Sequence, residues 1–107
     1  MPDTDHARRR LEARLAELKD RLGRIERDLA EPPDADSSER AVQMEDDESL
    51  EGQAVLVTGE IASVRRAIER IDEGTYGVCA QCGDAISANR LAARPEAALC
   101  IDCASGR

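Results

Sequence analysis

Apolar residues recur along the first thirty residues of the chain at alternating steps of four and three. The recurring positions are Leu11, Leu15, Leu18, Leu22, Ile25 and Leu29. This spacing is the a/d seam of a coiled coil, with which a helix packs against one partner helix. The pattern predicts a helix from about residue 5 to residue 30. Pro32 and Pro33 then end it, because proline cannot donate to the helical hydrogen-bond ladder.

A second seam with the same steps follows the prolines, at Leu50, Ala54, Val57, Ile61, Val64, Ile68 and Ile71. It predicts a helix from about residue 37 to residue 72, which ends where Gly74 supplies a C-terminal glycine signal. Neither helix can bury its stripe alone, so the two should fold back on each other as an antiparallel hairpin. Three glycines lie inside these helices, and close helix approach is the only reason for them that the sequence suggests: Gly23, Gly52 and Gly59.

The four cysteines form two CxxC pairs with seventeen residues between them: Cys79, Cys82, Cys100 and Cys103. A thioredoxin-like redox pair would need a βαβ pattern, which the chain lacks, and disulfides are typical of secreted domains. Two short hooks across a loop of this length instead favour a tetrahedral Zn²⁺. Four thiolates fill its coordination sphere, so we predict one structural zinc ion and no catalytic one. Gly83 permits the turn after the first pair.

Length and composition limit the core of this 107-residue chain, which has one tyrosine and no Phe or Trp. Zinc binding would supply folding energy that such a core lacks. We therefore predict a mainly α fold: a helical coiled-coil hairpin over residues 1–72 and a four-cysteine zinc finger over 73–107, joined at Tyr76 and Val78.

The start MPDTDHARRR has no apolar signal region, and no apolar run reaches membrane-spanning length, so we expect a cytoplasmic location. His6 is expected to be solvated.

The net charge of −8 is concentrated in one segment, since residues 31–51 carry one basic and nine acidic groups. Within it, residues 31–41 form the predicted tip of the hairpin. Asp36 and Glu39 fit a helix capping box, and they could equally present carboxylates to a basic or Mg²⁺-containing partner. A chain with a pI near 4.6 and no basic stripe is not expected to bind DNA directly.

The finger motifs YGxCxxCGxxI, RLxARP and LCIDC resemble the DksA/TraR family of bacterial regulators that bind RNA polymerase. The segment DSSERA, residues 36–41, stands where that family carries its DxxDxA tip motif. The resemblance covers residues 31–107, and the first helix matches it in character. It implies a non-enzymatic factor whose tip enters the secondary channel of RNA polymerase, with Asp36 and Glu39 as the acidic pair and Ala41 as the small residue that lets the tip fit.

Glu39 departs from the family motif, which has Asp there, and its extra methylene moves the carboxylate by about a bond length. Some family members respond to (p)ppGpp, and binding of this anion would require basic groups beside the finger. Arg90 and Arg94 could supply them, but the residue after the last cysteine, Ala104, is not basic. Two other functions stay open. One is a transcript-cleavage factor whose tip carboxylates hold Mg²⁺ in the same channel, and the other is an adaptor that loses zinc when its thiols are oxidised.

Overall fold

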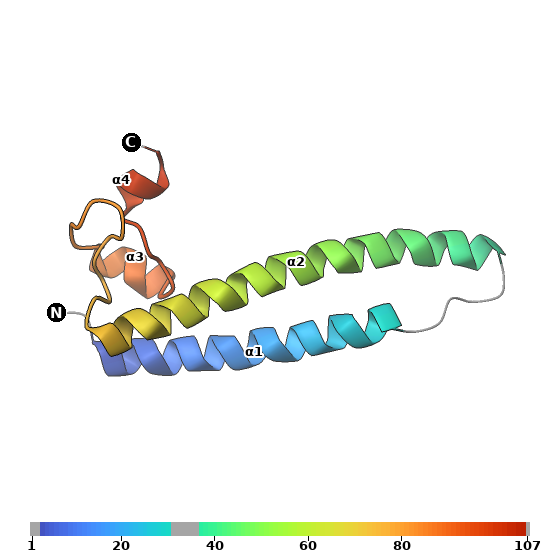
Figure 1. The fold of residues 1–107 in the computed structure, drawn as a ribbon, viewed down its shortest axis with the longest axis horizontal. Helices are drawn as coiled ribbons and strands as arrows, with labels where there is room; N and C mark the ends of the chain where they lie inside the picture. Colours follow the sequence, from blue (N-terminus) through green and yellow to red (C-terminus); the bar gives the residue numbers. More distant parts are fainter. Residues whose placement is uncertain (1–2, 31–36, 107) are drawn as a thin grey trace. The chain divides into compact units, whose positions relative to one another are not determined.

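The computed structural model describes residues 3–30 and 37–106, with the side chains of 37–48 outside the description. It contains four helices: α1 (Thr4–Ala30), α2 (Ser37–Glu73), α3 (Ala88–Ala93) and α4 (Ile101–Ala104). Figure 1 shows α1 and α2 as the two long helices, with α3 and α4 after them in the chain. No strand occurs in the described ranges, where the only ladder pairing is an isolated antiparallel bridge between Val78 and Ala85. The predicted mainly α hairpin with a four-cysteine module is confirmed.

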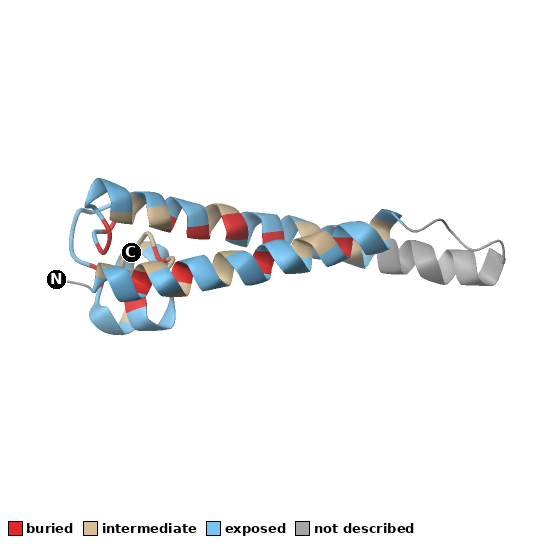
Figure 2. Ribbon diagram, turned by 90° about the horizontal axis from the view of Figure 1, so that it is seen from below, coloured by how far each residue is buried: buried red, intermediate tan, exposed pale blue. Residues whose placement is uncertain are grey.

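Two compact units can be distinguished, and the first comprises Ala16–Ile61. Here the predicted seams meet, since Leu18 and Ile25 of α1 and Val57 and Ile61 of α2 are all buried. Figure 2 shows such buried positions recurring along both helices. Leu18 is fully buried, as expected for a seam position that faces a partner helix.

The second unit comprises Met1–Leu15 and Ala62–Arg107. Leu11 and Val64 of the predicted seams are buried in it, and so are two alanines, Ala7 and Ala67, that the seams did not include. The guanidinium of Arg8 pairs with the Asp72 carboxylate, which joins the start of α1 to the end of α2. The predicted domain boundary between residues 72 and 73 stays a prediction.

None of the three helical glycines is a site of close approach between helices. A Cβ atom added at Gly52 or Gly59 would meet nothing within 4 Å, and one at Gly23 would meet only the Nη1 atom of Arg27, at 3.5 Å. Arg27 belongs to the same helix as Gly23, so the interpretation of all three glycines as close-approach positions is wrong. Gly52 and Gly59 lie on exposed parts of α2, where glycine simply lowers helix stability.

Candidate metal centre

The first cysteine pair lies in a tight loop that begins where α2 ends. Gly74, with φ of +79°, closes the helix as its N–H donates to the carbonyl of Ile71 at 3.2 Å. The loop then reverses: the N–H of Cys79 donates to the carbonyl of Asp84 at 2.8 Å, and the N–H of Gly83 donates to the carbonyl of Cys79 at 3.0 Å. Gly83 has φ of +79°, a left-handed conformation that side chains disfavour, as the sequence predicted.

The second pair lies at the start of the short helix α4. Cys100 is its N-cap residue, and the backbone N–H of Cys103 donates to the Cys100 Sγ at 3.5 Å. The carbonyl of Cys100 accepts from the N–H of Ala104 at 2.9 Å. In both CxxC pairs, local backbone hydrogen bonds therefore position the sulfur atoms.

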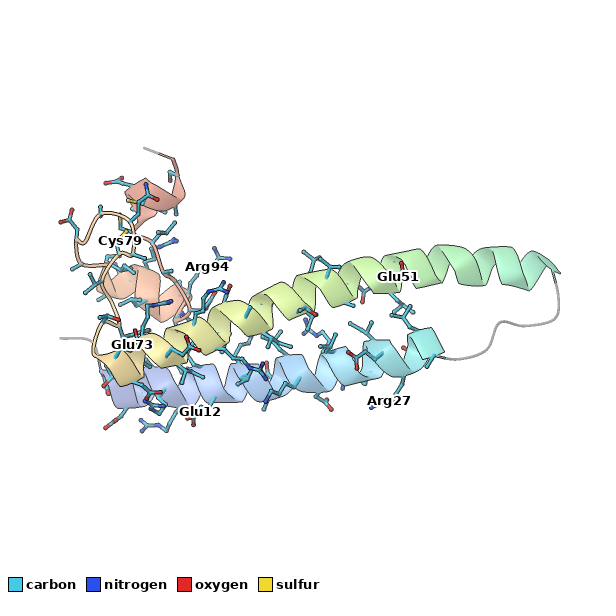
Figure 3. The ribbon with its side chains drawn as sticks, in the orientation of Figure 1. Glu12, Arg27, Glu51, Glu73, Cys79 and Arg94 are labelled. Carbon is cyan, nitrogen blue, oxygen red and sulfur yellow. The ribbon has the colours of Figure 1, made fainter. Side chains whose placement is uncertain are left out.

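The four Sγ atoms meet in one cluster and lie within 4.8 Å of one another. The Sγ atoms of Cys82 and Cys100 are 3.8 Å apart. A Zn–S bond of about 2.3 Å in a tetrahedral site places sulfur atoms about 3.8 Å apart, so the cluster fits one zinc ion with a small contraction. Cys79 is buried, and Figure 3 shows it in the loop beside α4. The prediction that four cysteines bind one zinc ion is confirmed.

The electrostatics of the cluster also favour a cation. Backbone N–H groups of Cys100 and Cys82 lower the pKa of Cys79 to about 6. The side-chain hydrogen bond with Cys100 raises the pKa of Cys103, because the neutral thiol keeps its proton for that bond, and repulsion from a Cys100 thiolate raises the pKa further. A divalent cation removes that repulsion and permits all four thiolates to ionise together. With four sulfur ligands, no coordination position remains for a substrate or water.

Three side chains fasten the finger to itself and to the end of α2. The Tyr76 hydroxyl donates to the Pro95 carbonyl at 2.9 Å, and Tyr76 is buried, which agrees with its predicted place at the join. The Nη2 of Arg70 donates to the Glu96 carbonyl at 3.2 Å, and the Nε of Arg90 donates to the Leu99 carbonyl at 2.8 Å. No spacing in the sequence indicates the Arg70 and Arg90 contacts, because an arginine that donates to a distant carbonyl has no local motif.

Val78 does not lie at the join, and that prediction is wrong. Its side chain is 43% exposed, whereas the neighbouring Cys79 is 2% exposed. Adjacent side chains point to opposite sides of extended backbone, so turning Cys79 toward the other sulfur atoms turns Val78 toward solvent. The metal ligand therefore decides the orientation of its neighbour.

The predicted tip residues fall outside the part of the chain whose side chains are described. Asp36 precedes the described start of α2, and Glu39 and Ala41 belong to the helix without described side chains. The helix does begin at Ser37, directly after Asp36. Their assignment as a partner-binding tip stays a prediction.

Among the helices in the described ranges, none combines the length and the apolar character needed to cross a bilayer.

Both halves of the chain match models of known protein families. Residues 8–71 match the model for the DnaK suppressor protein-like N-terminal domain, and residues 74–107 match the prokaryotic dksA/traR C4-type zinc finger. The RNA polymerase-binding transcription factor DksA of Escherichia coli (strain K12) is 35% identical over 103 residues, which are 92% of this chain and 66% of the relative. An uncharacterized protein of Aquifex aeolicus is 46% identical over 48 residues, which are 42% of this chain and 33% of that protein. Among solved structures, transcription factor DksA2 from Pseudomonas aeruginosa aligns with a TM-score of 0.82 at 28% identity, covering 99% of this chain and 89% of that one.

Proposed function

The chain belongs to the DksA/TraR family, and from this membership we propose that it is a non-enzymatic regulator of transcription that binds RNA polymerase directly. The observation that carries the proposal is the combination of two long antiparallel helices with a closed four-cysteine finger, each half matching its own family model. Relatives that align with this chain are named as RNA polymerase-binding transcription factors. The chain spans about two thirds of the length of the E. coli relative, so polymerase binding by this shorter chain has to be measured.

We further propose that the segment between α1 and α2 acts in the secondary channel of the polymerase. The charge distribution supports this, because residues 31–51 carry nine acidic groups and one basic group. The secondary channel leads to an active centre that holds Mg²⁺, and carboxylates favour such a cation. Asp36 and Glu39 would act there as the acidic pair, with Ala41 leaving room for them.

In this mechanism the zinc finger stabilises the base of the helical hairpin. The zinc ion would staple residues 79–82 to 100–103, and Arg70 fastens the resulting module to the end of α2. The site has no open coordination position, so its role is to fix the base of the hairpin and to offer a second contact surface. Zinc removal should accordingly weaken polymerase binding through loss of structure.

A pair of matched variants tests the proposal. The zinc-loaded protein and its Asp36→Asn and Asp28→Asn variants would be compared for binding to the cognate RNA polymerase and for their effect in multi-round transcription. Each variant removes one negative charge, but Asp28 lies near the end of α1, outside the predicted tip. We expect only Asp36→Asn to lose the effect on transcription while keeping affinity. Absence of binding by the unaltered protein would contradict the proposed function.

Glu39 provides a second test of the same mechanism. Glu39→Asp restores the family's motif and withdraws the carboxylate by one methylene, about a bond length, to which tightly positioned sites respond strongly. We expect this variant to change the size of the transcriptional effect without changing affinity. A transcript-cleavage assay on stalled complexes, run in parallel, would reveal a factor that delivers Mg²⁺ for cleavage instead.

A further inference from the structure

A cavity of about 430 Å³ lies between the start of α1 and the finger, entirely within the unit formed by Met1–Leu15 and Ala62–Arg107. Its volume falls in the range of pockets that hold small molecules, roughly 300–1,000 Å³. Small side chains account for the space, since the residues around it include Ala7, Gly77, Ala85, Ala88 and Ala92. The cavity is separate from the cysteine cluster, because none of the four cysteines lines it.

The walls of the cavity are predominantly apolar, and its floor is buried. Four of the lining side chains are between 5% and 8% exposed: Ala7, Tyr76, Ile86 and Leu91. Pro95 completes this surface, and its carbonyl accepts the hydrogen bond from the Tyr76 hydroxyl. Because that hydroxyl is already paired, Tyr76 presents mainly its ring to the cavity. An occupant must therefore bring an apolar body to match these walls.

The polar side chains of the lining come from the start of α1 and the residue before it: Asp3, His6 and Arg10. Arg10 is half-buried, and in the described part of the chain no ion pair involves it. Burial raises the pKa of Tyr76, and the positive charge of Arg10 opposes that rise, which indicates that the two groups lie close together. Asp3 also lines the cavity, but its carboxylate accepts from the backbone N–H of His6 at 3.1 Å and so caps α1.

We propose that this cavity binds an amphipathic organic monocarboxylate, with the carboxylate on Arg10 and the hydrocarbon body against Tyr76, Ile86 and Leu91. A guanidinium presents parallel N–H donors that match the two oxygens of a carboxylate. A single arginine beside the negative Asp3 favours a monoanion over a multiply charged phosphate ligand. Nothing in the proposed polymerase function requires this site, and the two proposals stand or fall separately.

The single tyrosine makes the test direct, because Tyr76 is the only aromatic residue of the chain and lines the cavity. The full-length, zinc-loaded protein would be titrated with sodium octanoate, which does not absorb where tyrosine is excited, while Tyr76 fluorescence is recorded. Octanamide serves as the neutral probe of the same length. We expect saturable binding of octanoate with a Kd of about 1 mM or tighter, and binding of octanamide weaker by about fivefold or more.

Two variants and a control locate the binding. Arg10→Gln should weaken octanoate binding by about fivefold or more, whereas Arg9→Gln, an adjacent exposed arginine outside the cavity, should leave it unchanged. Ala92→Leu should block octanoate by filling the cavity from α3. Circular dichroism and zinc content would verify that each variant is folded. Equal binding of octanoate and octanamide, equal effects of the two arginine variants, or no saturable signal with octanoate would each overturn the proposal.

Discussion

Truncation of Leu18 tests the packing of the two long helices most sharply. Leu18 is fully buried between α1 and α2, and Leu→Ala changes at such positions cost about 2–5 kcal/mol through lost burial and the cavity left behind. Two helices can close part of that cavity by moving together, so the lower half of this range applies. We expect Leu18→Ala to lower the free energy of unfolding by about 2–3 kcal/mol.

Leu56 provides the matched control, since it is a leucine of α2 in the same unit but is 69% exposed. Full burial of leucine stabilises by about 1.5–3 kcal/mol, so a side chain that is one-third covered contributes at most about 1 kcal/mol. Alanine also has a slightly higher helix propensity than leucine, which offsets part of that loss. Leu56→Ala should therefore change stability by well under 1 kcal/mol.

Urea unfolding of the zinc-loaded protein, followed by circular dichroism at about 222 nm, would measure both variants. The midpoints should separate while the slopes with urea concentration stay equal, because the surface exposed on unfolding barely changes. Equal destabilisation by the two truncations would contradict this prediction, since it would mean that the face of α2 with Leu56 is as buried as the seam.

Three further predictions concern zinc, a helical glycine and the tyrosine. EDTA with reductant should lower the melting temperature and the helical signal, with recovery on adding Zn²⁺, because zinc binding contributes on the order of 10 kcal/mol to folding such modules; unchanged unfolding would contradict this. Gly59→Ala should stabilise α2 by up to about 1 kcal/mol in thermal unfolding, since no atom lies within 4 Å of the added Cβ; a loss of stability would show an unseen contact. Burial raises the pKa of Tyr76, so the folded state retains the phenol proton and its stability should fall as pH rises above about 10, a loss that Tyr76→Phe should reduce. Absorbance titration of this single tyrosine should give a midpoint above its ordinary value, and one at or below that value would contradict the burial.

The parts of the fold that the sequence predicted are those set by periodicity and by cysteine spacing. Leu18 and Val57 are buried because a seam repeat commits a helix to one face, wherever its partner comes from. The cysteine cluster was predictable because two CxxC hooks and a tetrahedral ion leave few other arrangements. Both signals are local in sequence, and each survives without knowledge of the tertiary structure.

The missed features depend on contacts between segments far apart in the chain. Ala67 is fully buried, but alanine occurs on buried and exposed helix faces alike and carries no pattern of its own. Arg70 meets carbonyl groups 26 and 27 residues away, which no spacing rule anticipates. The cavity beside Arg10 exists because small side chains from α1 and α3 face one another, so only the tertiary structure reveals it.

Site-specific cross-linking from position 36 to the cognate RNA polymerase would show whether the segment between α1 and α2 enters the secondary channel. A photoreactive residue at position 36 would be compared with one at position 28, using the zinc-loaded protein and mapping the cross-linked polymerase peptides. We expect cross-links from position 36 to the active-centre side of the secondary channel, and weaker or different ones from position 28. Cross-links from position 36 only to the outer surface of the polymerase, or none above those of the free label, would contradict this expectation.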